Sequence, residues 1–448
     1  MGNWLIHDAT LVNEGVVWEG DLRVRGERID TVGGALSARA DETVVDAAGA
    51  WLLPGLIDDQ VHFREPGLEY KATIATESRA AVAGGITSVM EMPNTNPPTT
   101  TLAAVSDKYA RAARSSVANH AFYLGATNDN IEVIRRFTRH DGCGIKIFMG
   151  ASTGNMLVDD PVVLSAVFAE ADTLIITHCE DTPTVDAALA IEKERYGDTL
   201  DATRHPYVRS AEACIKSTRL AIELARRHDA RLHVLHVSTA DELTLFDADV
   251  PLEDKRITAE TCVHFLHFDA DDYPRLGNLI KCNPAIKFAD DRTAIVNALA
   301  EGRLDVLATD HAPHTREEKA QPYLSAPAGL PLVQHHLPVA LERVLDGEMT
   351  ISTLVQRACH APAVLFGVAD RGYLREGAYA DLVLVDPQRP QRIQPAQLLS
   401  KCGWSPFEGE TLCSTVVSTW VNGHRVWNEG DLDDSVLGRR LEIGRGRD

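Results

Sequence analysis

Chemically reactive side chains recur in this sequence at the ends of apolar runs that have β-strand character. Histidines and an aspartate end several separate runs, and imidazole and carboxylate are common ligands of zinc. Several such residues at different strand ends therefore predict a metal site. The residues concerned are Asp58, Asp59, Gln60, His62, Arg64, Asn94, Lys146, His178, Glu180, Asp181, His233, His236, His264, Asp310, His311 and His314.

Lys146 lies between Ile145 and Ile147 in the run CGIKIFMG. Neighbouring strand residues face opposite sides, so the lysine points inward if the isoleucines pack against helices. A buried lysine tends to lose its proton, and a neutral amine can react with carbon dioxide to give a carbamate, an anionic metal ligand. An ion pair with a nearby acid explains the lysine equally well, and the spacing does not decide between these interpretations.

The elements that position these residues are eight apolar runs, separated mostly by segments with an amphipathic helical pattern. The runs are 52–63, 85–93, 118–127, 143–150, 173–180, 231–238, 256–264 and 304–312. Eight β–α repeats predict a (β/α)8 barrel of the TIM type, in which the strand C-termini meet at one mouth. The alternative, an open doubly wound sheet, usually has a glycine-rich phosphate loop after its first strand. The sequence has no such loop.

Both ends of the chain differ from this middle part, because they contain short alternating strands separated by turns. The segment VNGHRV near the C-terminus is typical of a β-hairpin, with Asn-Gly between apolar residues. We therefore expect one small, β-sandwich-like domain formed by residues 1–53 and 371–448, with the barrel occupying residues 54–370.

The composition excludes several classes of protein. The 448 residues are 44% hydrophobic and 24% charged, as in globular proteins rather than disordered chains. A net charge of −21 argues against nucleic acid as a partner, and no apolar run is long enough to span a membrane. The N-terminus lacks the pattern of a signal peptide and the eight cysteines are scattered, so we expect free thiols and a cytoplasmic location.

Several motifs resemble those of the amidohydrolase superfamily. They are PGLIDDQVHFREPG, MPNTNPPT, GIKIFMG, THCED, LHVLHVST, ATDHAPH and GYLREGAYADLVLVD. Within that superfamily, HFREPG, MPNTNPP, KCNPAIK, ATDHAPHT and SPFEG are similar to the motifs of dihydroorotases. The resemblance covers nearly the whole chain. It implies a metal-bearing barrel that interconverts N-carbamoyl-L-aspartate and L-dihydroorotate in de novo pyrimidine (UMP) biosynthesis.

The resemblance also implies roles for individual residues. The expected metal ligands are His62, His178, His236, Asp310 and Lys146, the last as a carbamate bridging two zinc ions. Asp310 would shuttle the proton of a metal-bound hydroxide, Arg64 and Asn94 would bind the substrate carboxylate, and Asn283 and His314 would line the pocket. Gln60 stands where the family has its first metal-binding histidine. Because an amide oxygen binds zinc less well than imidazole does, we expect one or two zinc ions, one of them held weakly.

Two other functions remain open at this stage. The chain fits a catalytically inactive scaffold for aspartate transcarbamoylase, because Gln60 replaces a metal ligand. It also fits another cyclic amidohydrolase, such as an allantoinase or dihydropyrimidinase, although a neutral ring has no use for Arg64. The expected partners are a small-molecule substrate, a second copy of the chain in a homodimer, and in one alternative a transcarbamoylase. Residues 313–331 are a candidate loop over the substrate.

Overall fold

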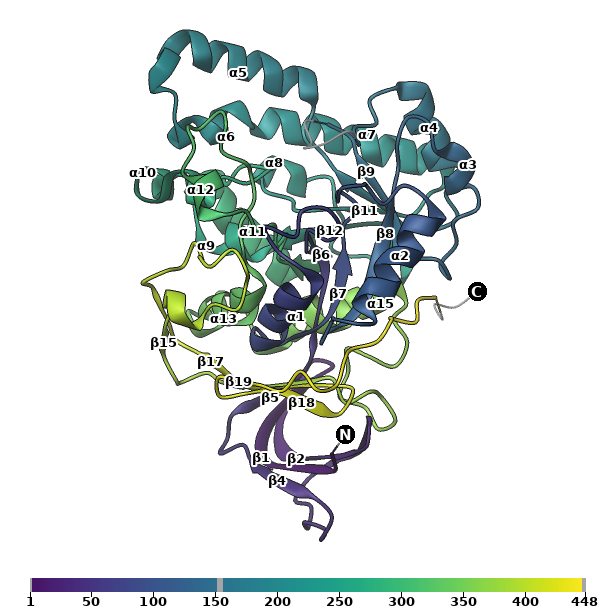
Figure 1. The fold of residues 1–448 in the computed structure, drawn as a ribbon, viewed down its shortest axis with the longest axis vertical. Coiled ribbons are helices and arrows are strands. Elements are labelled where there is room, and N and C mark those ends of the chain that lie inside the picture. Colours follow the sequence, from purple (N-terminus) through teal and green to yellow (C-terminus); the bar gives the residue numbers. More distant parts are fainter. Residues whose placement is uncertain (1, 151–155, 445–448) are drawn as a thin grey trace.

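Eight parallel strands form the centre of the computed structural model, which describes residues 2–150 and 156–444 (Figure 1). Each strand pairs with the next one in the chain, and the first and last meet where the His62 N–H donates to the His311 carbonyl at 2.7 Å. This arrangement confirms the predicted barrel. The strands are β6 (Leu56–Val61), β7 (Ile86–Glu91), β8 (Asn119–Gly125), β9 (Gly144–Phe148), β10 (Ile175–His178), β11 (Leu232–Val234), β12 (Ile257–Cys262) and β13 (Val306–Ala308).

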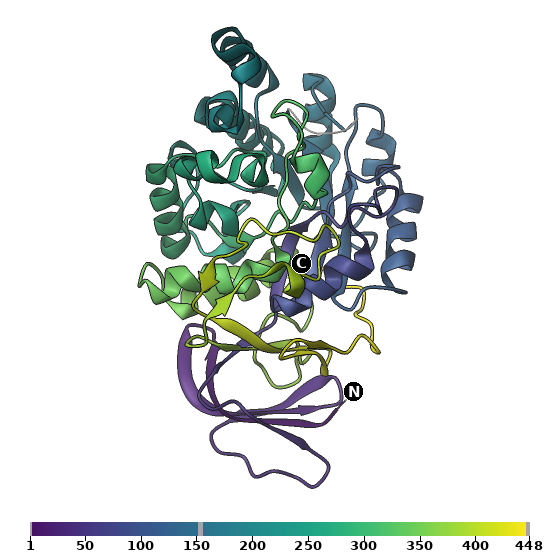
Figure 2. The same ribbon diagram turned by 60° about the vertical axis from the view of Figure 1, so that its left-hand side comes forward.

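Helices surround this barrel on its outer side (Figures 1 and 2). The longer ones are α1 (Ile74–Ala83), α2 (Leu102–Ala112), α4 (Pro161–Glu170), α5 (Thr182–Tyr196), α7 (Ala211–His228), α11 (Ala289–Glu301) and α13 (His336–Leu345). The shorter ones are α3 (Ile131–Ile134), α6 (His205–Val208), α8 (Ala240–Leu243), α9 (Val263–His267), α10 (Tyr273–Leu276), α12 (Arg316–Lys319), α14 (Ile351–Val355) and α15 (Ala361–Phe366). Because helices cover the sheet, strand residues are buried on both faces.

Helix α7 illustrates how local sequence defines these elements. Ser210 caps its N-terminus by accepting a hydrogen bond from the Ala213 N–H. One face buries small and apolar side chains such as Ala221 and Leu224 against the barrel. Basic residues in the last turn, including Arg226, favour the negative end of the helix dipole.

Strands from both ends of the chain form a second, nine-stranded sheet (Figure 1). Its members are β1 (Trp4–Asn13), β2 (Val16–Arg25), β3 (Arg28–Gly33), β4 (Thr43–Asp46), β5 (Trp51–Pro54), β14 (Leu382–Asp386), β17 (Thr415–Val421), β18 (His424–Asn428) and β19 (Asp431–Leu432). The antiparallel pair of β5 and β14 joins the N-terminal strands to the C-terminal ones. The first apolar run of the sequence, 52–63, is therefore divided between two sheets, with β5 in this sheet and β6 in the barrel.

Part of the C-terminal region leaves this sheet and returns to the barrel. Strands β15 (Gln391–Arg392) and β16 (Thr411–Leu412) form a separate pair. Between them, the Trp404 indole N–H donates to the His314 carbonyl at 2.7 Å, and Phe407 stacks on Phe268. Residues 398–408 thus pack beside the segment that follows β13.

The sequence predicts free cysteines and no segment that spans a membrane. No cysteine is in a disulfide in the described part of the chain, and six of the eight are buried. Within residues 2–150 and 156–444, no helix combines the length and apolar character needed to cross a bilayer.

Candidate active site

A pocket opens at the C-terminal ends of the barrel strands. Its wall contains the metal-ligand and substrate-contact residues that the resemblance implies, except His314. The other strand-end residues singled out in the sequence do not line it, namely Asp58, Asp59, Glu180, Asp181, His233, His264 and His311. The lining residues are Gln60, His62, Arg64, Asn94, Lys146, Phe148, His178, His236, Asn283, Asp310, Ala312, Ala328 and Gly329. His314 lies behind Arg64, with its Nε2 at 3.1 Å from the arginine Nη2.

Asp310 is the centre of one group of polar side chains in this pocket. Its Oδ1 lies 3.1 Å from His62 Nε2 and accepts a hydrogen bond from Gln60 Nε2, also at 3.1 Å. The other ring nitrogen of His62 lies 2.7 Å from Asn94 Oδ1. Burial lowers the pKa of His62, so this imidazole is neutral at neutral pH. The Gln60 amide nitrogen faces Asp310, while its oxygen lies 3.7 Å from Cys262 Sγ.

Lys146 extends from β9 into the pocket, as the alternation in GIKIF predicts. Its side chain is almost fully buried, and Nζ lies 4.7 Å from the centroid of the Phe148 ring. Burial lowers the pKa of Lys146 to about 8. A substantial neutral fraction of the amine is therefore present at neutral to slightly alkaline pH.

His178 and His236 form a second group in the pocket, at the ends of the neighbouring strands β10 and β11. Their nitrogens Nδ1 and Nε2 face each other at 3.0 Å. His178 Nε2 lies 3.1 Å from Glu180 Oε2, which in turn accepts a 2.5 Å hydrogen bond from Arg209. Although burial opposes ionisation of Glu180, Arg209 and His178 lower its pKa to about 2. Glu180 is therefore an anion that orients His178.

These side chains are suitable ligands for a borderline metal such as zinc. They include three neutral-imidazole residues, one carboxylate and one lysine with a lowered pKa. The Nδ1 atom of His236 is buried without a hydrogen-bond partner among the described residues. Two facing imidazole nitrogens and an orphaned one fit a cation better than a protein hydrogen-bond network, in which buried polar atoms are paired.

Arg64 provides positive charge in the wall of the pocket. Its Nε donates to the Pro313 carbonyl at 3.1 Å, which fixes the direction of the guanidinium group. Burial lowers its pKa to about 10, so it remains charged at neutral pH. Burial, and then the Arg64 charge, lower the pKa of His314 to about 3, so Arg64 has a neutral neighbour there. A buried, oriented guanidinium is suited to a carboxylate of a ligand.

Three pocket residues have left-handed backbone conformations just beyond their strands. The φ angles are 68° at Arg64, 40° at His236 and 52° at Asp310. Non-glycine residues rarely adopt such angles, and each costs about 1–3 kcal/mol. The backbone therefore turns sharply where it directs these side chains into the pocket.

Two buried lysines hold the segment 313–331 that forms one wall of the pocket. Lys319 Nζ donates to the carbonyls of Lys281, Pro327 and Gly329 at 2.9–3.0 Å, so all three ammonium protons have acceptors. Lys281 Nζ donates to two further carbonyls of this segment. A Cβ atom on Gly329 would lie 2.4 Å from the Ala312 carbonyl oxygen. The segment is therefore a close-packed wall that is fixed to the barrel.

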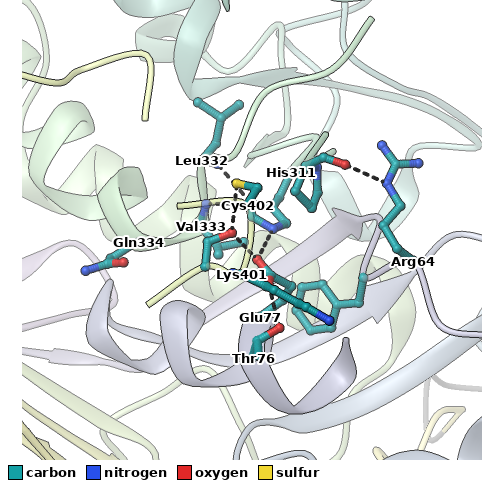
Figure 3. Close-up of polar contacts among 12 residues, drawn as sticks. Arg64, Thr76, Glu77, His311, Leu332, Val333, Gln334, Lys401 and Cys402 are labelled. Atoms are coloured by element: carbon teal, nitrogen blue, oxygen red, sulfur yellow. Dashed lines mark hydrogen bonds and ion pairs between the residues drawn. The ribbon is translucent and has the colours of Figure 1, made fainter. Parts of the chain in front are cut away.

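Glu77 of α1 supports the pocket from behind (Figure 3). Its Oε2 lies 2.8 Å from His311 Nε2 and accepts a 2.5 Å bond from Ser400, while Oε1 accepts the Lys401 N–H at 3.0 Å. His311 Nδ1 accepts the N–H groups of Leu332 and Val333. His311, the residue next to Asp310, is thus fixed through both of its ring nitrogens.

Comparison with known proteins agrees with this geometry. The amidohydrolase family profile matches residues 51–426, which include the whole barrel and most of the C-terminal strands. The chain belongs to the amidohydrolase family. It is 37% identical to the dihydroorotase of Halobacterium salinarum over 440 residues, which are 98% of this chain and 99% of that protein.

Other members of the amidohydrolase family are also similar. The allantoinase of Streptomyces avermitilis is 33% identical over 388 residues, 86% of each chain. Among solved structures, the L-hydantoinase (dihydropyrimidinase) from Arthrobacter aurescens superimposes with a TM-score of 0.91 at 28% identity, covering 98% of this chain and 100% of that one. The fold alone therefore does not distinguish among ring-opening activities, and the pocket residues must do so.

Two residues with contacts in the pocket of this amidohydrolase were not among those predicted from the sequence. Phe148 was missed although it is two residues after Lys146 on β9, and this spacing places it on the same face. Arg209 was also missed. It contacts Glu180, and with the Asn283 amide in its favourable orientation its Nη2 donates to the Asn283 oxygen at 3.1 Å. No local motif marks an arginine in this position.

Proposed function

We propose that the chain is a dihydroorotase that reversibly cyclises N-carbamoyl-L-aspartate to L-dihydroorotate and water in de novo pyrimidine (UMP) biosynthesis. The observation that carries this proposal is the buried Arg64 guanidinium in the wall of a pocket with metal-ligand side chains. Both proposed substrates carry a carboxylate that takes no part in ring closure, and Arg64 and Asn94 would bind it. Similarity to dihydroorotases over nearly the whole chain supports the same conclusion.

Zinc is the metal that we propose for this pocket. His178 and His236 would hold one ion, His62 and Asp310 the other, and a carbamate on Lys146 both. When bound, zinc lowers the pKa of water and polarises a carbonyl oxygen. Gln60 would contribute weakly, because its nitrogen rather than its oxygen faces Asp310.

The protein side chains would then divide the remaining work. Arg64 and Asn94 orient the ring, and Asn283 would lie along its edge, with His314 supporting Arg64 from behind. In ring opening, water adds to the ring carbonyl, the amide C–N bond breaks, and an Asp310 oxygen carries the proton from water to the leaving nitrogen. In ring closure, Asp310 moves the proton in the opposite direction and water is expelled.

A turnover assay distinguishes this proposal from its alternatives. Purified protein with added zinc should open L-dihydroorotate and close N-carbamoyl-L-aspartate, and should act far more slowly on allantoin, hydantoin and dihydrouracil. Faster turnover of a neutral ring would favour another cyclic amidohydrolase. Absence of turnover on all of these substrates, with intact fold and metal, would favour the scaffold for aspartate transcarbamoylase. The homodimer and the cytoplasmic location stay predictions, the first testable by light scattering.

The unequal metal sites provide a separate prediction. Because Gln60 is a poor ligand, mild chelation should remove one zinc ion before the other. Gln60→His should raise the zinc retained in this pocket towards two ions, and Lys146→Ala should abolish both activity and zinc binding in this pocket, with partial rescue by short carboxylic acids. Two equally retained ions in the wild type, unaffected by Gln60→Ala, would contradict the asymmetry.

A further inference from the structure

A second group of metal-ligating side chains lies inside the barrel, outside the pocket wall. It consists of Asp59 on β6, His233 on β11 and Glu260 on β12, and one ligand atom of each lies within 4.8 Å of the others. All three side chains are fully buried, and none lines the pocket at the mouth. The group is thus separate from the ligand set described above.

The hydrogen bonds around His233 define which nitrogen faces the carboxylates. Its Nδ1 lies 2.8 Å from the Thr258 hydroxyl, and that hydroxyl donates its one proton to the Leu232 carbonyl at 3.3 Å. The hydroxyl must therefore accept a proton from His233 Nδ1–H. A neutral His233 then presents the lone pair of Nε2 to the two carboxylates, as metal-binding histidines do when their other nitrogen is held by a hydrogen bond.

The distances from this nitrogen fit a bound cation. His233 Nε2 lies 3.2 Å from Glu260 Oε2 and 3.5 Å from Asp59 Oδ2. Ligands held at zinc-ligand distances in a tetrahedral site lie roughly 3.3–3.6 Å apart. The longer distance exceeds that of an ordinary N–H···O hydrogen bond. One Nε2–H group does not satisfy both carboxylates.

The Asp59 carboxylate is the second sign of a missing ligand. Neither of its oxygens has a hydrogen-bond partner among the described residues, although the side chain has no solvent exposure. A buried, unpaired carboxylate is strongly unfavourable. The Tyr123 hydroxyl donates to the Asp59 backbone carbonyl, at 2.8 Å, and not to the carboxylate.

The charges of the group require either one divalent cation or two protons. Two carboxylates and a neutral imidazole carry two negative charges, which one divalent ion neutralises. Without a cation, neutralising the group in the barrel interior takes one proton on His233 and another on a carboxylate. One imidazole and two carboxylates are ligands that zinc and similar transition metals accept.

We propose that Asp59, His233 and Glu260 bind a divalent transition-metal cation, with zinc as the expected ion, as a structural site inside the barrel. The ion would join β6 to β11 and β12, which are separate strands of the barrel. Because the site has no exposed ligand, the ion would enter during folding and stabilise the folded state. This proposal does not depend on which substrate the pocket accepts.

Anomalous diffraction from crystals of the zinc-containing protein tests the proposal directly. Data on both sides of the zinc absorption edge should show a peak between Asp59, His233 and Glu260, apart from any peak in the pocket. Density with no anomalous peak there, in crystals that show zinc in the pocket, would overturn the proposal. His233 would then be an imidazolium that bridges two carboxylates.

Metal content measured by native mass spectrometry gives an independent test. Asp59→Asn should bind one zinc ion fewer than the wild type, whereas Lys146→Ala should lose pocket zinc and keep one ion. Glu242→Gln is the matched control, because Glu242 is a buried carboxylate whose two oxygens accept hydrogen bonds from the hydroxyl groups of Thr218 and Thr239. Its zinc content should equal that of the wild type. Equal zinc content in folded Asp59→Asn and wild type would contradict the site, whatever the activity of either protein.

Discussion

Asp310 receives two polar contacts on a single carboxylate oxygen, from His62 and from Gln60. Its second oxygen remains available to the pocket, and its left-handed backbone conformation directs it there. This geometry is suited to a group that accepts a proton and returns it. The same residue would also be a metal ligand, so its substitution has to preserve shape in order to separate the two roles.

Asp310→Asn should retain the fold and lose most turnover. The amide fills the same space and accepts a hydrogen bond through its oxygen, but it does not carry a proton between water and the leaving nitrogen. We expect kcat to fall by about 10²–10⁴-fold, the range for loss of a general acid–base group. Steady-state assays with dihydroorotate would measure this effect. The exposed Asp249→Asn variant is the control, and Asp310→Asn activity within a few-fold of it would remove Asp310 from the proton-transfer role.

Arg64→Met should lower kcat/KM for dihydroorotate, because a buried charge pair with the substrate is lost. The loss of transition-state stabilisation should be about 2–4 kcal/mol. The methionine keeps the length of the aliphatic stem, so packing against the wall changes little. Turnover of a neutral cyclic amide should fall much less. Arg114→Met, at an exposed position on the surface, is the control. An unchanged kcat/KM in Arg64→Met would show that another residue binds the carboxylate.

At the scale of elements, the pocket depends on contacts between segments that are distant in sequence. Glu77 joins helix α1 to the end of β13 and to the 400–402 segment through bonds to His311, Ser400 and Lys401 (Figure 3). Although burial opposes its ionisation, His311 and Ser400 lower the pKa of Glu77. The carboxylate is therefore a charged, fully paired group within the core.

Glu77→Ala should lower the free energy of unfolding by about 3–5 kcal/mol, because each buried donor left without its acceptor costs about 1–3 kcal/mol. It leaves His311, Ser400 and the Lys401 N–H without their acceptor. Denaturant unfolding followed by tryptophan fluorescence would measure the change. In contrast, Glu348→Ala removes an exposed ion pair with Arg343 and should cost at most about 1 kcal/mol. Similar losses in the two variants would mean that the Glu77 network does not stabilise the fold.

The sequence predicted elements better than it predicted contacts between them. The alternation around Lys146 correctly placed that side chain inside the barrel, and strand-end polarity located most of the polar residues that line the pocket. The division of the run 52–63 was not predictable, because β5 and β6 are both apolar and only Gly55 separates them. The contacts of Arg209, and the return of Trp404 to the mouth, depend on tertiary packing that has no local periodicity.

At the scale of the whole molecule, a strongly acidic chain encloses many buried neutral histidines. Burial lowers the pKa of His120 and His335 to about 4 and that of His336 to about 3. The unfolded chain titrates these groups near pH 6.5. As pH falls below that value, the unfolded state binds protons that the folded state does not, so the free energy of unfolding decreases. The stabilisation from neutral histidines is complete above about pH 6.5 and is lost progressively towards pH 3–4.

His336→Phe should reduce this acid sensitivity. His336 begins helix α13, is fully buried, and neither ring nitrogen has a hydrogen-bond partner among the described residues. Phenylalanine is of similar shape and does not titrate. Between pH 7 and pH 5, the wild type should lose about 2 kcal/mol more unfolding free energy than the variant, since each pH unit below 6.5 costs about 1.4 kcal/mol for one such group. Unfolding in urea at both pH values measures the difference directly.

His140→Phe, at an exposed position, should show the same pH dependence as the wild type. Because the comparison is between slopes, a packing change that shifts stability equally at both pH values does not affect it. Parallel pH dependence in His336→Phe and wild type would show that His336 does not contribute to acid unfolding.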